Sequence, residues 1–264
     1  GHLSAGSGKN IFIATSPEGT DINNDGAIGS TDSVIGIGNA YLSDYSVDMS
    51  VGSLPTVSVT MEGANIRSVT NGSSIGSPAV EQSDGTAIGY NISLPTPNSG
   101  TSTALTALRP GDITVSLTNF DGDTIADLAG VDGAHVQSVS LSLPLSRTSL
   151  DRLGTRFPFA REVDFPVTVS MSISAIVNET TAMNLTDKLA TEVQSATVTL
   201  KDEDSTDAAI WTLKGAQVDS ESFSSAIGSN QTLDLTLSAQ VGGPADSAAG
   251  LFLSGASISG IFGA

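Results

Sequence analysis

The sequence contains no cysteine, and this absence excludes a disulfide scaffold, a thiolate zinc site and thiol catalysis. Charged residues make up only 14% of the 264 residues, about half the usual share. Basic residues are scarcest: 10 Lys and Arg stand against 28 Asp and Glu, for a net charge of −18. Binding nucleic acid through its phosphates requires clustered Lys and Arg. The composition therefore disfavours a protein that wraps nucleic acid, but it is compatible with a surface that nucleic acid slides past.

Long apolar runs and catalytic motifs are also missing. No stretch approaches the ~18 apolar residues of a membrane span, so we expect no membrane insertion. The only histidines are His2 and His135, and no nucleophile elbow of the G-x-S-x-G type is present. Gly6-Ser7-Gly8-Lys9 departs from a phosphate-binding loop, because Asn10 stands where Ser or Thr would bind magnesium. We therefore expect a protein that is not an enzyme and that needs no catalytic cofactor.

Strict alternation of apolar and polar residues, the pattern of a half-buried strand, occurs in four long segments. The segments 45–51 and 56–62 are separated by the tight turn Gly52-Ser53-Leu54-Pro55, and this spacing predicts a β-hairpin. The segments 138–145 and 167–175 are separated by a polar connection from Ser146 to Asp164. They predict a second long pair of strands built on the same plan.

The polar positions of these four strands are almost entirely Ser and Thr, with Asp48 and Glu62 as the only charges. An ordinary solvent face mixes long Lys, Arg and Glu side chains. Short neutral side chains indicate a face that is wet but crowded, or one that lines a channel. The alternative is a Ser/Thr-rich sheet facing bulk water, as in many adhesins. The positions are Ser46, Asp48, Ser50, Thr56, Ser58, Thr60, Glu62, Ser138, Ser140, Ser142, Thr168, Ser170, Ser172 and Ser174.

Together with the rest of the chain, these strands predict a single all-β domain over 1–264, of the β-sandwich or barrel type with one or two short helices. Shorter strands are expected at 113–117, 196–200, 209–213 and 232–239, with weak ones at 90–94, and short helices at 146–153 and 179–192. The Gly-, Ser- and Thr-rich segment 64–110 is interpreted as a surface excursion. The Gly/Ala/Ser-rich segment 242–264 is interpreted as a tail that packs only in an assembly.

Two features suggest binding. The segment 21–32, DINNDGAIGSTD, has the spacing of a calcium loop and resembles a single dockerin-type loop. The alternative is an Asp/Asn/Gly turn, because no second loop accompanies it and 33–38 is a poor helix former. Its ligands would be Asp21, Asn23, Asp25, the Ala27 carbonyl and Asp32. Separately, the connection after Leu145 holds four of the ten basic residues, which suit docking on an acidic neighbour: Arg147, Arg152, Arg156 and Arg161.

Three phrases resemble the tail tube (major tail) proteins of long-tailed bacteriophages. They are IGIGNAYLSDYSVDMSVGSLPTVSVTMEGANI at 35–66, VSLSLPLSRTSLDRLGTRFPFAREVDFPVTVSMSISAIV at 139–177 and IWTLKGAQVDSESFSSAIGSNQTLDLTLSAQVG at 210–242. The resemblance covers about half the chain and includes nothing in 64–110. It implies a β-sandwich with a flanking helix, whose two long hairpins join those of neighbouring copies in an inter-subunit β-barrel.

The same resemblance implies a structural virion protein of the phage tail. Its partners would be further copies of itself, in hexameric rings stacked into a tube, together with other tail proteins. DNA would pass through the tube without specific binding, and the Ser/Thr face would line the lumen. The runner-up is a secreted or cell-surface β-sandwich binding module that carries one calcium loop.

Overall fold

The computed structural model of the chain is all-β, as predicted, and every strand pair is antiparallel. The structure describes residues 8–19, 32–70, 79–81, 87–89, 113–118, 124–127, 134–177, 195–201, 207–224 and 230–255, and within them it contains no helix. The helix expected at 146–153 is wrong. Residues Arg147–Leu150 form strand β10, which pairs with β11 (Ala160–Val163), and Gly154 turns the chain at a φ of 86°. The helix expected at 179–192 and the strand expected at 90–94 lie outside the described residues.

The larger sheet contains all four alternating segments side by side. Its strand order is β3-β2-β9-β12-β16-β15, so the two predicted pairs are neighbours in one sheet. The β2–β3 hairpin joins Asp48 to Thr56 across the predicted turn, where Gly52 has a φ of 85°. The strands are β2 (Ser33–Ser50), β3 (Thr56–Glu62), β9 (Ala134–Pro144), β12 (Val167–Val177), β15 (Gln217–Ser224) and β16 (Thr232–Val241).

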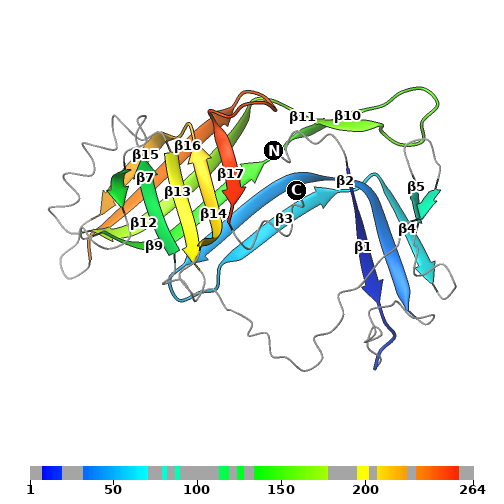
Figure 1. The fold of residues 1–264 in the computed structure, drawn as a ribbon, viewed down its shortest axis with the longest axis horizontal. Coiled ribbons are helices and arrows are strands. Elements are labelled where there is room, and N and C mark those ends of the chain that lie inside the picture. The colour runs from blue at the N-terminus through cyan, green and yellow to red at the C-terminus, as the bar shows by residue number, and fades with distance from the viewer. Residues whose placement is uncertain are drawn as a thin grey trace.

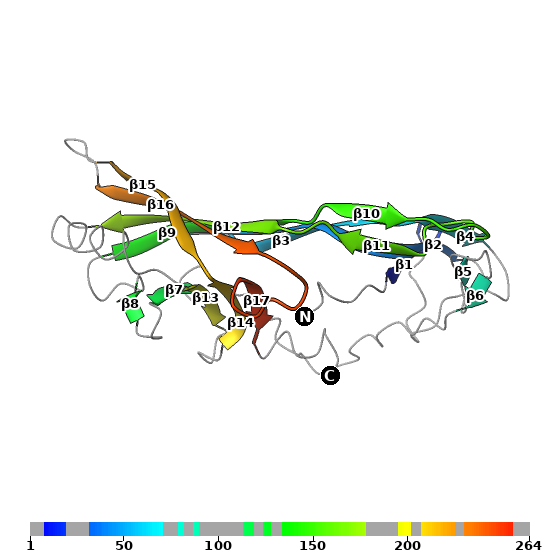
Figure 2. The same cartoon turned by 90° about the horizontal axis from the view of Figure 1, so that it is seen from above.

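A smaller sheet lies against one part of the larger sheet, which makes a sandwich (Figures 1 and 2). Its order is β17-β14-β13-β7-β8. The strands are β7 (Ile113–Thr118), β8 (Thr124–Asp127), β13 (Ser195–Lys201), β14 (Asp207–Lys214) and β17 (Gly250–Ser254). Strand β17 lies in the segment expected to pack only in an assembly. It pairs with β14 within the chain, and the assembly-dependent packing expected of 242–264 stays a prediction.

The core lies between the two sheets and is built from the apolar positions of the alternating strands. Leu141, Met171 and Leu237 form one cross-strand row of the larger sheet, and each is at most 1% exposed. Val115, Val198 and other side chains of the smaller sheet cover them in a single buried cluster. Replacing a buried leucine by alanine typically costs about 2–5 kcal/mol. The continuity of this cluster therefore fixes which face of each alternating strand points inward.

One hydrogen bond joins the two sheets through polar atoms of otherwise apolar side chains. The indole N–H of Trp211 in β14 donates to the Tyr45 hydroxyl of β2 at 2.9 Å. Burial raises the pKa of Tyr45 above its ordinary value of 10.0, and the hydrogen bond from Trp211 offsets part of that rise. Because Trp211 is the only tryptophan of the chain, its fluorescence reports on this junction alone.

We expect Tyr45→Phe to destabilise the fold by about 1–3 kcal/mol, because it leaves the buried indole N–H without its acceptor. Because the pKa of Tyr45 is raised in the folded state, its contribution to the free energy of unfolding is complete below pH 10. This contribution is lost as the pH rises through the folded-state pKa. Urea unfolding followed by Trp211 fluorescence should therefore show a midpoint that falls above pH 10 in the wild type, and by less in Tyr45→Phe. An equal alkaline fall in both proteins would contradict the assignment.

The larger sheet continues beyond the sandwich as an arm (Figure 1). In the arm, the first half of β2 pairs with β1 (Lys9–Thr15) on one side and β4 (Asn65–Thr70) on the other. Register shifts near Asn39, which has a φ of 51°, and at Ser43 separate the arm from the sandwich half of β2. Strands β5 (Ala79–Glu81) and β6 (Ala87–Gly89) form a small hairpin. Strand β4 thus ties the beginning of the segment 64–110 into the main sheet.

Candidate assembly surface

The polar face of the larger sheet is a set of cross-strand rows of short side chains. Directly opposed residues of antiparallel strands lie on the same face, so the register defines these rows. One row is Ser58, Ser46, Ser142, Ser170 and Ser238, and the next is Thr56, Asp48, Ser140, Ser172 and Thr236. A third row is Ser50, Ser138, Ser174 and Asp234. We call these three rows the hydroxyl face.

The hydroxyl face is wider than the sequence predicts. Strand β16 adds Asp234, Thr236 and Ser238, and β15 adds Ser220 and Ser222 opposite them. The alternation of β16 is visible in the sequence, but only the register shows that its polar residues continue the same rows. The three rows contain two carboxylates and neither Lys nor Arg. Any anion that approaches this face meets hydroxyls and carboxylates.

Strand β3 is an edge strand with apolar side chains left in solvent. The smaller sheet does not cover it, and Val57 and Val59 are 51% and 54% exposed, although they occupy the apolar positions of the alternation. Natural edge strands are usually protected by charged side chains, by Pro or by β-bulges. Between Thr56 and Thr60 the strand has no charged residue and no Pro. Among the described strands β3 pairs only with β2, so its second edge and its exposed valines form a surface suited to pairing with another strand.

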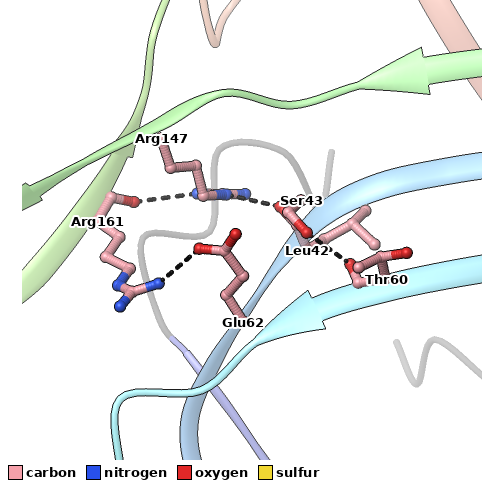
Figure 3. Close-up of polar contacts among 6 residues, drawn as sticks. All are labelled: Leu42, Ser43, Thr60, Glu62, Arg147 and Arg161. Carbon is pink, nitrogen blue, oxygen red and sulfur yellow. Dashed lines mark hydrogen bonds and ion pairs between the residues drawn. The ribbon is translucent and has the colours of Figure 1, made fainter.

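The β10–β11 hairpin is fastened to its own chain by two of the four predicted contact arginines (Figure 3). The Arg147 guanidinium donates to the carbonyl of Leu42 at 2.8 Å and to that of Arg161 at 3.0 Å. Burial lowers the pKa of Arg147, and Tyr41, whose ring lies 5.4 Å away, and Glu162 offset this effect. Arg161 pairs with Glu62 at 3.0 Å. Arg147 and Arg161 therefore position the hairpin within the subunit.

Arg152 and Arg156, in contrast, lie exposed near the end of the hairpin, over the rings of Phe159 and Phe157 at 5.4 and 5.6 Å. The predicted contact with a neighbouring subunit stays a prediction for these two. We expect the double variant Arg152→Glu, Arg156→Glu to fold normally but to assemble poorly, and most poorly at low salt, where charge interactions are least screened. Sedimentation at several salt concentrations measures this. Assembly equal to wild type would leave both arginines as solubilising residues.

Most of the predicted calcium loop lies outside the described residues, namely Asp21, Asn23, Asp25 and Ala27. Asp32 is described: it is 3% exposed and accepts a hydrogen bond from the Ser16 hydroxyl at 2.8 Å. No group of three or more His, Asp or Glu side chains suited to a metal ion occurs in the part of the chain that the structure describes. The calcium loop stays a prediction. The same described part holds no helix long and apolar enough to cross a membrane.

No family model matches the chain, and no curated protein matches it. Solved structures are partly similar. The PVC sheath–tube complex of an extracellular contractile injection system has a chain with 13% identity and a TM-score of 0.39, over 61% of this chain and 100% of that one. The anti-feeding prophage baseplate has a chain with 17% identity and a TM-score of 0.33, over 59% of this chain and 98% of that one. The Hcp1 protein of the E. coli EAEC 042 pathovar, as a double mutant, has 8% identity and a TM-score of 0.28, over 55% of this chain and 98% of that one. With TM-scores below 0.5, these likenesses are partial.

Proposed function

We propose that the chain is a non-catalytic tube subunit, whose larger sheet joins those of neighbouring copies in a closed ring around a channel. One observation carries the proposal. A single antiparallel sheet has a core face, a hydroxyl face without Lys or Arg, and an unprotected edge strand with exposed valines. Closure into a barrel removes such edges.

The two ends of the sheet suit each other as ring contacts. Strand β3 ends the sheet on one side and β15 on the other, and the six strands from β3 to β15 alternate in direction. In a ring with rotational symmetry, β3 of one copy would therefore meet β15 of the next in antiparallel order. Each copy would contribute six strands rather than the predicted four, because β16 already occupies the free side of β12. Val57 and Val59 would then be covered by the neighbour.

The hydroxyl face would line the channel of this ring. A wall of hydroxyls and carboxylates forms no charge-assisted pairs with phosphates, so DNA can pass without being held. The proposed setting is a phage tail, in which hexameric rings stack into a tube and other tail proteins close its ends. No metal or cofactor is needed for this role.

Negative-stain electron microscopy of concentrated protein tests the proposal. Rings or tubes are the expected result. Dispersed monomers at every concentration would contradict it and would favour the secreted binding module. Calorimetry with and without a calcium chelator would then decide whether that module depends on the 21–32 loop.

A further inference from the structure

The arm carries an apolar face that the described part of the chain covers only in part. Ile11 lies opposite Ile37, which lies opposite Ile66 across β1, β2 and β4. Ile13 lies opposite Ile35 in the adjacent row. These five isoleucines form one patch on one side of the arm, here called the isoleucine face. Ile66 is 72% exposed and Ile13 is 46% exposed, whereas Ile11, Ile35 and Ile37 are half-buried.

The reverse side of the arm shows that the exposure is specific to one face. Val34 of β2 is 0% exposed, and Gly36, two residues further on the same side, is buried. The exposed large apolar side chains of the arm, Ile13 and Ile66, therefore lie on the isoleucine face. Contiguous exposed apolar surface on a soluble protein typically marks an interaction site.

A second bare apolar surface lies at the other end of the same strand. At the β2–β3 turn, Val51 and Leu54 are 60% and 66% exposed. The 18 residues of β2 separate this turn from the beginning of the arm by a contour length of about 60 Å. The free end of the β2–β3 hairpin and the arm lie at opposite ends of β2 (Figure 1), so the turn cannot cover the isoleucine face of its own chain.

Charge indicates what occupies the isoleucine face. The chain carries a net charge of −18, so two copies repel each other over most of their surfaces. Neither the five isoleucines nor the turn residues 51–55 include an ionisable side chain. Two copies can thus approach at these surfaces without bringing carboxylates together, and burying both surfaces removes apolar area from water.

We propose that the β2–β3 turn of one copy docks on the isoleucine face of a second copy in a head-to-tail contact. This inference rests on the proposed function and deepens it, because the contact joins two different surfaces of the subunit. Each copy then still has one of the two surfaces available, so further copies can be added until a ring closes or a filament grows. The contact therefore links successive rings along the tube, whereas β3 and β15 link copies within a ring.

Cysteine pairs test the contact, because the chain contains no cysteine of its own. In the variant Leu54→Cys, Ile66→Cys, a short bismaleimide should produce a ladder of covalent multimers in denaturing gels. A mixture of the two single variants should produce dimers and nothing larger. The matched control is Leu54→Cys, Arg67→Cys, since Arg67 is the exposed neighbour of Ile66 on the opposite face of β4.

Each other outcome overturns the contact in a recognisable way. Dimers from Ile66→Cys alone would mean that two isoleucine faces meet each other. An equal ladder from the Arg67 control would mean collision without a specific site. Rings in the microscope without crosslinking of the Leu54, Ile66 pair would overturn this inference and leave the proposed function standing. The absence of both rings and crosslinks would overturn both.

Discussion

Met171→Asp should prevent folding, whereas Val59→Asp should leave the subunit folded and abolish its assembly. Both residues occupy apolar positions of alternating strands, but Met171 is 0% exposed and Val59 is 54% exposed. A buried, unpaired carboxylate costs several kcal/mol, which is a large share of the roughly 5–15 kcal/mol that holds a domain together. At Val59 the same carboxylate stays hydrated in the monomer and loses water only when a neighbour covers β3.

Circular dichroism during thermal unfolding and size-exclusion chromatography separate the two effects. Ser58→Asp is the matched control, because it adds the same charge to the same strand on the hydroxyl face. We expect this control to fold and to form rings. Normal rings from Val59→Asp would exclude β3 as an interface, and a stable Met171→Asp monomer would contradict the described core.

Ser140→Lys and Ser170→Lys should leave tube assembly intact but slow the release of DNA from assembled particles. Both positions lie on the hydroxyl face, where a lysine side chain can extend into the water of the proposed channel. Each ammonium would attract DNA phosphates and release their counterions, which holds the DNA in place. The effect of Ser170→Lys should be the larger of the two. Ser140 lies directly opposite Asp48, which would offset a lysine there, whereas Ser170 lies between Ser142 and Ser238.

The rate of DNA release, measured at increasing salt, distinguishes charge from bulk. The slowing by lysine should diminish as salt rises, because phosphate contacts depend steeply on ionic strength. Ser170→Gln is the control, since it adds length without charge, and it should release DNA at the wild-type rate. Lysine variants that fail to assemble would show that the hydroxyl face is packed rather than wet, and the channel assignment would fail.

Period-two alternation is sufficient to find the strands that have one buried and one wet face. For this reason the sequence predicts β3, β12 and β16 with nearly correct limits, but it finds only the second part of β2, from Tyr45, and of β9, from Ser138. Strand β15 escapes detection because its residues Asp219 to Ser222 are polar on both faces. Strand β10 is mistaken for a helix because its short run of Arg, Thr, Ser and Leu has no strand-like alternation. Its pairing with β11 decides its conformation.

The candidate surface is less predictable, because it depends on pairings between distant residues. Alternation places Val57 and Val59 with the core residues, and only the limited reach of the smaller sheet leaves them exposed. The partners of Arg147 and Arg161, Leu42 and Glu62, lie 105 and 99 residues away in the chain. Composition alone cannot distinguish these two arginines from Arg152 and Arg156, which remain at the surface.

Strand β2 also has a thermodynamic consequence. One continuous strand serves as the middle of the arm and as an inner strand of the sandwich. The arm contributes no residue to the buried core cluster, so its own packing stabilises it less than the sandwich is stabilised. Because half of β2 is already ordered by the sandwich, the arm needs to order fewer backbone residues when it forms. Heating should therefore melt the arm first, while the sandwich half of β2 keeps its amide protons protected from exchange until the whole subunit unfolds.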